Sequence, residues 1–256
     1  MSDIINNKEE RVKMCAVVEN YCAVEKRVEA ACARGGRDRS EVTLIAVSKT
    51  KPVEDIQALI DYGVTQFGEN KVQEMCGKEE VLTKGLSWHM IGHLQRNKVK
   101  YLMGKTCLIH SVDSLRLAEE IQKEAAKAGI ICPVLMEINI GNEESKGGIA
   151  IDEAETLARQ IAALPNVRLK GLMCIAPFVD DPEENRLHFR RMREKRDELA
   201  AFNIPGTEIH ELSMGMTGDF EVAIEEGATL VRVGTAIFGE RHYAKAVSSV
   251  QTTKND

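Results

Sequence analysis

Eight short β-rich segments alternate with amphipathic helical segments along this chain, and this alternation limits the possible folds more than any other feature. The predicted strands cover residues 42–48, 65–68, 88–91, 107–111, 133–139, 167–173, 208–212 and 229–233. The predicted helices cover residues 8–34, 53–62, 69–83, 93–103, 113–129, 151–163, 183–201 and 217–226. Eight βα units in 256 residues predict a single α/β (β/α)8 barrel with an extra N-terminal helix. A doubly wound open sheet is the alternative.

No linker or low-complexity segment divides the sequence. We therefore expect one domain over residues 1–256, with its core at about residues 8–243. Hydrophobic residues make up 43% of the chain and charged residues 29%, and no apolar run is long enough to cross a bilayer. The N-terminal residues "MSDIINNKEERVK" lack the apolar segment of a signal peptide, which predicts a cytoplasmic protein.

Charge and cysteine content exclude several classes of function. A net charge of −6 gives no electrostatic reason to bind nucleic acid, and we expect the basic run "FRRMREKR" to be a solvated helix face. Seven scattered cysteines form no C-x-x-C pair, which indicates reduced, packed thiols. We therefore predict a protein that binds neither nucleic acid, membrane nor metal, and a monomer, because no segment forms an evident dimer seam.

The segment "VTLIAVSKTKP" places a lysine, Lys49, at the end of a buried strand. In a (β/α)8 barrel the active face lies at the carboxyl ends of the strands, so Lys49 would point into the mouth of the barrel. A partly desolvated amine loses some preference for its charged form and becomes a better nucleophile toward a carbonyl group. Lys51 could add repulsion between like charges in the same direction. The simpler alternative is a lysine that only extends its head into solvent.

The loops after the seventh and eighth strands carry the residue types of a phosphate site. Ser213 and Thr217 offer hydroxyl groups, and Gly234-Thr235 can present backbone N–H groups to an anion. Serine, threonine and glycine are also ordinary turn residues, so either loop alone is weak evidence. Together with Lys49, the two loops suggest a ligand that has both a carbonyl group and a phosphate. Pyridoxal phosphate and a phosphorylated ketose both meet this description.

Other motifs point to no further chemistry. His89 and His93 have a spacing that metals accept, but they span a strand end and a loop, and no H-E-x-x-H motif is present. The sequence also lacks G-x-S-x-G, P-loop and dinucleotide-binding motifs, so hydrolase, NTPase and dehydrogenase functions have no support.

Seven sequence blocks resemble, in order, those of the YggS/PROSC family of pyridoxal-phosphate homeostasis proteins, over about residues 10–243. The blocks are "AVSKTKP", "QFGENKVQE", "WHMIGHLQRNK", "INIGNEESKGG", "RLKGLMCIAP", "LSMGMTGD" and "VRVGTAIFGER". The resemblance implies the barrel of fold-type III alanine racemases, with pyridoxal 5′-phosphate bound covalently to Lys49 as an internal aldimine. It also implies cofactor contacts by Asn70, Met90, Ser213, Thr217, Arg232, Gly234 and Thr235. Gly218, where related chains often carry another residue, is a small departure.

Within that resemblance, Arg232 matches the arginine that faces the pyridine nitrogen in the racemase-like fold. A guanidinium group is always protonated, so it donates a hydrogen bond to this nitrogen but leaves no proton there. The pyridine ring then stays neutral and is a weaker electron sink. The alternative is a strand arginine paired with a nearby carboxylate such as Glu211.

Three functions remain open: a non-catalytic carrier of pyridoxal phosphate, a racemase or decarboxylase that uses this cofactor, and a lysine-dependent aldolase. Racemases and decarboxylases of this fold close their pocket with a second β domain, whereas only a short segment follows the last predicted strand near residue 233. An open site suits transfer of the cofactor to apo-enzymes better than controlled carbanion chemistry. The sequence therefore favours a carrier without substantial activity of its own. The aldolase alternative conflicts with the family blocks.

Overall fold

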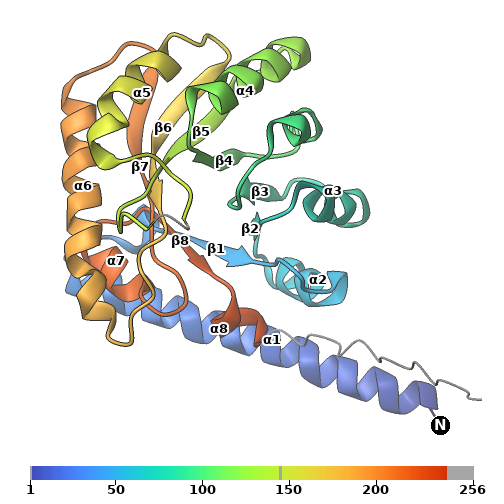
Figure 1. The fold of residues 1–256 in the computed structure, drawn as a ribbon. Coiled ribbons are helices and arrows are strands. Elements are labelled where there is room, and N and C mark those ends of the chain that lie inside the picture. The colour runs from blue at the N-terminus through green and yellow to red at the C-terminus, as the bar shows by residue number, and fades with distance from the viewer. Residues whose placement is uncertain (1, 144–145, 241–256) are drawn as a thin grey trace, which may run out of the picture.

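The fold is a closed parallel barrel of eight strands, seen in a computed structural model that describes residues 2–143 and 146–240 (Figure 1). The strands follow one another in chain order, and β1 pairs with β8. Their bounds are β1 (Thr43–Val47), β2 (Gln66–Glu69), β3 (Ser87–Met90), β4 (Leu108–Val112), β5 (Cys132–Ile138), β6 (Val167–Cys174), β7 (Thr207–Ser213) and β8 (Leu230–Val233). The predicted barrel is confirmed, each strand to within one residue at either end, and the open sheet is wrong.

Helices surround the barrel in the predicted order. The α-helices are α1 (Ser2–Arg34), α2 (Val53–Tyr62), α3 (Val72–Val81), α4 (Leu115–Ala128), α5 (Ala154–Ala162), α6 (Arg186–Ala201), α7 (Phe220–Glu225) and α8 (Thr235–Phe238). Short 3-10 turns occur at η1 (Arg39–Glu41), η2 (Arg96–Tyr101), η3 (Ile151–Glu153) and η4 (Pro182–Asn185). The α-helix predicted over residues 93–103 is wrong, because this segment forms only the shorter η2, in which the N–H groups of Lys98 and Leu102 bond to the carbonyls three residues before them.

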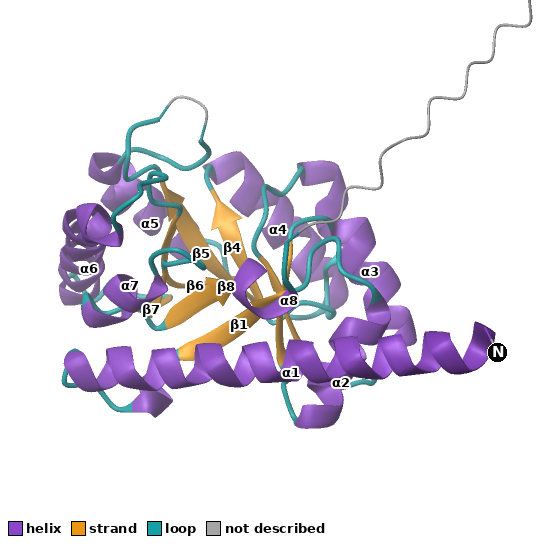
Figure 2. Ribbon diagram, turned by 90° about the horizontal axis from the view of Figure 1, so that it is seen from below, coloured by secondary structure: helices purple, strands orange, loops and turns teal. Residues whose placement is uncertain are grey.

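The extra N-terminal helix, α1, runs along one side of the barrel. It contacts α2, α7 and α8, and Figure 2 shows it running along the lower part of the view, below α7 and α8. Its buried side chains include Val17, Val24, Val28 and Ala31, which recur at intervals of three, four and seven residues. This spacing puts them on one face of a helix, so α1 is held by an apolar stripe.

The hydrophobic core has two parts, one inside the barrel and one outside it, and the part to which a strand residue belongs indicates the direction of its side chain. A small cluster fills the inside of the barrel and consists of Ile45, Leu108, Leu135, Met173 and Leu230. A much larger cluster lies between the barrel and its helices and takes the alternate strand residues, such as Leu44 and Val231. Because strand side chains alternate in direction, the residues two and four positions after the inner cluster also face inward.

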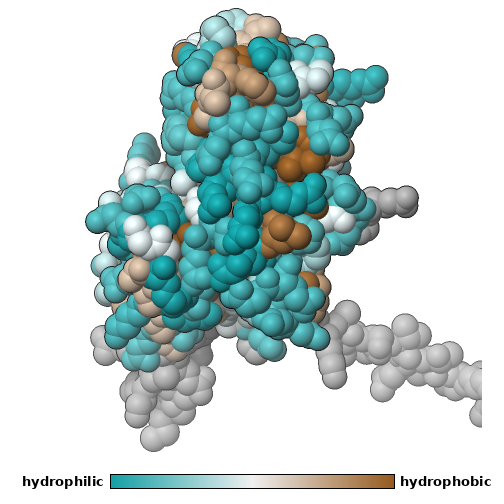
Figure 3. Space-filling view, turned by 90° about the vertical axis from the view of Figure 1, so that its left-hand side faces the viewer, coloured by the Kyte–Doolittle hydropathy of each residue, from teal (hydrophilic) through white to brown (hydrophobic). Residues whose placement is uncertain are grey.

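The basic run on α6 is only partly a solvated face, so that prediction needs correction. The side of the molecule that displays α6 is mainly hydrophilic (Figure 3). However, Arg190 and Arg193 of this run, together with Arg186 before it, all pair with the Glu226 carboxylate, at 2.9, 3.3 and 3.2 Å. Burial opposes the charge of Glu226, but the arginines outweigh it and the pKa of Glu226 is lowered. These ion pairs tie α6 to the end of α7.

The cysteines whose side chains are described are free thiols. Cys132 and Cys174 are buried, and burial raises the pKa of each to about 12. Cys107 is exposed, which differs from the packed thiols expected. No helix within the residues that the structure describes has both the length and the apolar character needed to cross a membrane.

Candidate functional site

Lys49 and Arg232 face the inside of the barrel from neighbouring strands. Lys49 lies four residues after Ile45, and Arg232 lies two residues after Leu230, both of which belong to the inner cluster. The ladder of β1 continues past its last residue, because the Ser48 N–H donates to the Gly68 carbonyl at 3.1 Å. Strand alternation therefore turns Lys49 toward the mouth, on the same side as Arg232.

The turn that carries Lys49 is held on both sides by α3. The Lys78 ammonium donates to the Ser48 carbonyl at 2.8 Å, to Glu69 at 2.8 Å and to Glu74 at 2.7 Å. The Ser48 hydroxyl donates to Glu69 at 2.6 Å, and the Thr50 N–H donates to Glu74 at 2.5 Å. Thr50 has φ = 63°, a conformation that β-branched residues rarely adopt. These bonds hold a strained turn and so fix the direction of Lys49.

Replacing Lys78 with methionine is expected to lower the free energy of unfolding by about 3 kcal/mol at neutral pH, because Glu69 would be left as a buried charge without a cation. Burial already raises the pKa of Glu69 above its ordinary value of 4.5, against the opposing effect of Lys78. Because the pKa of Glu69 is raised, this group takes up a proton as the pH falls toward 4.5 and loses its buried charge. The stability deficit of the variant should therefore shrink at low pH. Denaturant titrations at several pH values measure this deficit.

The control for this substitution is the double variant Lys78→Met with Glu69→Gln. It removes both charges of the buried pair, whose side chains are 7% and 0% exposed. Much of the lost stability should return in the double variant. A deficit that is the same in both variants and at every pH would mean that packing, not charge, explains the effect.

Lys51 supports α8. Its ammonium donates to the carbonyls of Phe238, Gly239 and Glu240, at 3.0, 2.9 and 3.0 Å. A cation at the C-terminal end of a helix is favoured by the unsatisfied carbonyls there. Lys51 thus joins the turn after β1 to the end of α8.

The loops after β7 and β8 are built close together. Gly215 has φ = 90°, and its carbonyl accepts from the Arg232 N–H at 3.0 Å. A Cβ on Gly215 would lie 2.6 Å from the Cβ of Ala223, so this turn requires glycine. Gly234 lies against Val47 of β1, where a Cβ would meet the Val47 carbonyl at 3.4 Å. The two predicted phosphate loops therefore adjoin each other and the β1 end.

Hydroxyl and backbone donors in these loops differ in accessibility. Thr217 is half-buried and Thr235 is exposed. The carbonyl of Gly234 accepts from the N–H groups of Ile237 and Phe238, so the N–H groups of Thr235 and Ala236 precede the first hydrogen bond of α8. These donors are suitable for an anion. The phosphate role of Thr217, Gly234 and Thr235 stays a prediction.

Arg232 is fully enclosed and is held by uncharged groups. Its guanidinium donates to the Ser213 hydroxyl at 2.5 Å and to the Cys174 carbonyl at 2.9 Å. Glu211 does not pair with it and instead accepts from the Thr229 hydroxyl, so the alternative of an Arg232–Glu211 pair is wrong. Burial lowers the pKa of Arg232, although a guanidinium remains protonated at neutral pH. The site thus holds a buried positive charge whose hydrogen bonds go to neutral oxygens.

Asn70 and Met90 lie on different sides of the barrel wall. Asn70 follows β2, four residues after the inward-facing Gln66, and its Oδ1 atom is buried without a hydrogen-bond partner. Met90 is fully buried in the outer core, next to His89, whose ring points inward. The structure therefore brings Asn70 toward the predicted site but does not bring Met90 there, because neighbouring strand residues face opposite ways.

His89 and His93 do not converge, as a metal site would require. His89 lies inside the barrel, whereas the side chain of His93 is 70% exposed, with its Nδ1 atom 3.7 Å from the Asp113 carboxylate. Across the described side chains, no group of three or more histidine, cysteine, aspartate or glutamate residues is arranged to hold a metal ion.

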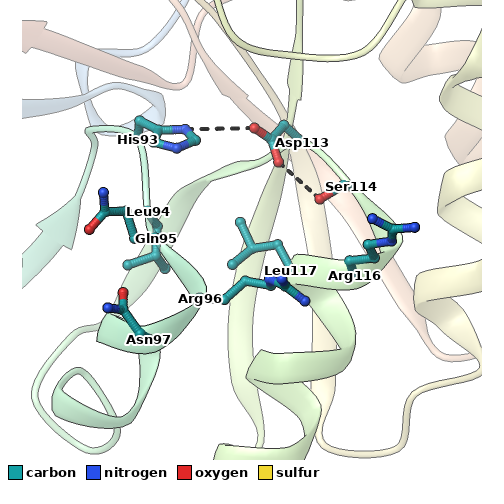
Figure 4. Close-up of a pocket in the computed structure, with 9 residues that line it drawn as sticks. All are labelled: His93, Leu94, Gln95, Arg96, Asn97, Asp113, Ser114, Arg116 and Leu117. Atoms are coloured by element: carbon teal, nitrogen blue, oxygen red, sulfur yellow. Dashed lines mark hydrogen bonds and ion pairs between the residues drawn. The ribbon is translucent and has the colours of Figure 1, made fainter.

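A pocket of about 560 Å³ lies beside this end of the barrel, between the loops that follow β3 and β4 (Figure 4). It is lined by His93, Leu94, Gln95, Arg96, Asn97, Asp113, Ser114, Arg116 and Leu117. None of the predicted site residues lines it. Its two arginines are exposed and Asp113 offsets part of their charge, so we assign the chemistry to the barrel mouth instead.

Three buried polar residues that face the barrel interior were not predicted from the sequence. They are His110, Glu137 and His89, the last of which had been considered only as a metal ligand. Glu137 lies two residues after Leu135 of the inner cluster, and burial raises its pKa. His110 lies two residues after Leu108, and both nitrogens of its ring are hydrogen-bonded, one to His89 and the other to Ser213. The available signal was a polar residue inside an otherwise apolar strand, which a barrel tolerates only with a partner.

Comparison with known proteins agrees with this geometry. The family model described as "Alanine racemase, N-terminal domain" matches residues 22–242. A protein of Aquifex aeolicus named "Pyridoxal phosphate homeostasis protein" is 49% identical over 227 residues, covering 88% of this chain and 98% of that one. The structure of PipY from Synechococcus elongatus with PLP bound has a TM-score of 0.73 and 35% identity, covering 84% of this chain and 100% of that one.

Alanine racemases share the fold at much lower identity. The enzyme of Corynebacterium glutamicum has a TM-score of 0.68 and 16% identity, and the match covers 91% of this chain but 63% of the racemase. This likeness concerns the barrel alone.

Proposed function

Since the chain belongs to the family of pyridoxal phosphate homeostasis proteins, which has the barrel of the alanine racemase N-terminal domain, we propose that it binds pyridoxal 5′-phosphate and takes part in its homeostasis. The observation that carries this proposal is that Lys49 and the buried Arg232 face the same barrel mouth from the neighbouring strands β1 and β8. The Lys49 amine would condense with the cofactor aldehyde, forming a C=N bond and releasing water, to give a Schiff base.

The residues at the mouth fit this cofactor. Lys49 supplies the amine, and Arg232 supplies a buried cation whose bonds go to a hydroxyl and a carbonyl. Asn70 offers an oxygen that is buried and without a hydrogen-bond partner. Gly234 allows the backbone of the β8 loop to approach a phosphate closely. When bound, the cofactor would supply an aldehyde that takes up amines reversibly.

A carrier fits this site better than an amino-acid enzyme does. Arg232 would donate a hydrogen bond to the ring nitrogen but would not protonate it, which would handicap reactions that pass through a fully delocalised carbanion. The relatives named as homeostasis proteins match over nearly their whole length, whereas the racemase matches over 63% of its chain. We therefore propose a carrier that hands the cofactor to apo-enzymes, acting as a cytoplasmic monomer and without substantial catalysis.

The visible absorption spectrum of the purified protein tests cofactor binding directly. A Schiff base absorbs near the violet end of the visible range, and borohydride reduces it to a stable amine. We expect the band to vanish on reduction and the label to map to the peptide that contains Lys49. A protein that stays colourless after incubation with pyridoxal phosphate, and that borohydride does not label, would refute the proposal.

The phosphate loops give a second test. Thr217→Ala should weaken retention of the cofactor by about 1–3 kcal/mol, because it removes a donor to a dianion. Retention is measured by dialysis against buffer, with pyridoxal as the matched ligand that lacks the phosphate. Wild-type protein should bind pyridoxal much more weakly, and the substitution should not weaken pyridoxal binding further. Equal affinity for the two ligands would exclude a phosphate site in these loops.

A further inference from the structure

A chain of hydrogen bonds crosses the inside of the barrel from β8 to β2. It begins at the Arg232 guanidinium, which donates to the Ser213 hydroxyl at 2.5 Å. The Ser213 oxygen lies 2.8 Å from Nδ1 of His110, and Nε2 of His110 lies 3.0 Å from Nδ1 of His89. The chain ends where Nε2 of His89 lies 2.9 Å from Oε1 of Gln66. Five side chains from five strands are thus connected end to end.

The orientation of Gln66, with its carbonyl oxygen toward His89, sets the proton positions along this chain. A carbonyl oxygen only accepts, so Nε2 of His89 must carry the hydrogen. A neutral imidazole carries one hydrogen, so Nδ1 of His89 accepts from Nε2 of His110. By the same reasoning Nδ1 of His110 accepts from the Ser213 hydroxyl, whose oxygen accepts from Arg232. All the hydrogen bonds therefore run in one direction, from Arg232 to Gln66.

The surroundings of the two histidines keep them neutral. Both rings are buried, with His110 completely so, and they meet edge to face. Burial lowers the pKa of His89 to about 4, and burial together with the nearby His89 and Arg232 lowers the pKa of His110 well below its ordinary value. A second positive charge beside Arg232 would be costly in this interior.

We propose that Gln66, His89 and His110, acting through Ser213, are positioning residues that hold the Arg232 guanidinium in the orientation needed to face the ring nitrogen of the cofactor. The inference rests on the proposed function for the identity of that ring. A buried arginine has many rotamers and no carboxylate here to fix it, so Ser213 and the Cys174 carbonyl must do so. Ser213 in turn can fix it only if its own hydrogen has an acceptor.

This arrangement also changes the role of Ser213. Its one hydrogen is used by His110, so the hydroxyl has no donor left for a phosphate oxygen. The phosphate contacts predicted for this region then fall to Thr217 and to the backbone of the β8 loop. Ser213 belongs to the support of the ring-nitrogen contact instead.

The proton positions are tested by NMR on the full chain with 15N-labelled histidine, with and without added pyridoxal phosphate. Long-range 1H–15N spectra distinguish the two neutral tautomers and the charged form, and His89→Gln and His110→Gln assign the signals. We expect both rings to be neutral with the hydrogen on Nε2 between pH 6 and 8. Either ring found charged, or with its hydrogen on Nδ1, would overturn the one-way chain.

The positioning role is tested by a matched pair of substitutions at His110. Asparagine places an oxygen near the position of Nδ1 and can still accept from Ser213, whereas glutamine places its amide near Nε2 and cannot. His110→Asn should keep the Kd for pyridoxal phosphate within about threefold, and His110→Gln should raise it about tenfold or more, the usual range for a hydrogen bond to a charged group. The absorption maximum of the bound cofactor should shift in His110→Gln alone.

Thermal unfolding of both variants checks that the barrel is intact. If either variant fails to fold, the proton positions found by NMR on wild-type protein test the proposed chain instead. Wild-type affinity in His110→Gln, or a greater loss in His110→Asn, would overturn the positioning role while leaving cofactor binding in place. Failure of wild-type protein to bind pyridoxal phosphate would refute the proposed function and with it the contact to the ring.

Discussion

Lys49→Ala is expected to abolish the covalently bound cofactor and the yellow colour of the protein while the barrel stays folded. Lys49 is half-buried at the end of β1 and belongs to neither hydrophobic cluster, so its side chain contributes little to the core. The substitution removes the amine that we propose forms the Schiff base, so the loss of covalent cofactor should be complete. Absorption spectra and mass spectrometry after borohydride reduction measure the loss.

The matched control for this experiment is Lys51→Ala, two residues away in the same turn. Lys51 donates to three backbone carbonyls at the end of α8, so its loss should loosen that helix but leave the colour in place. Circular dichroism of both variants verifies the fold. A Lys49→Ala protein that keeps its visible band, with label on another lysine, would remove Lys49 from its proposed role.

The strands and their order were predictable because each strand of a parallel barrel is a short, nearly continuous apolar run between helical segments. The residues 42–48 and 133–139 illustrate this pattern, and the structure confirms both as β1 and β5. The segment 93–103 misled the prediction, because its lysines and arginine favour a helix, whereas the structure has only the 3-10 helix η2 over Arg96–Tyr101.

The direction of single side chains was less predictable than the strands. A shift of one residue turns a strand side chain from the inside of the barrel to the outside. Met90 and His89 show this: resemblance suggested Met90 for the site, but the structure buries it in the outer core and turns His89 inward. The chain from Arg232 to Gln66 joins residues 166 positions apart in the sequence, so only the closed barrel brings them together.

The carrier proposal predicts that amino acids will not be turned over. Catalysis at the amino-acid Cα needs a competent electron sink and acid and base groups on both faces of the bound substrate, each of which contributes large rate factors.

Arg232 is held by neutral partners as a permanent hydrogen-bond donor, and in the proposed contact with the ring nitrogen it would weaken the sink. We therefore expect only trace racemase, decarboxylase or transaminase activity with L- and D-amino acids. The loaded protein should instead reactivate an apo-form enzyme that depends on pyridoxal phosphate, faster than the spontaneous release of cofactor into buffer allows. Lys49→Ala, which cannot carry the cofactor covalently, is the control and should not transfer it. Rapid turnover of any one amino acid that persists through repurification and disappears in Lys49→Ala would establish an enzyme in place of the carrier.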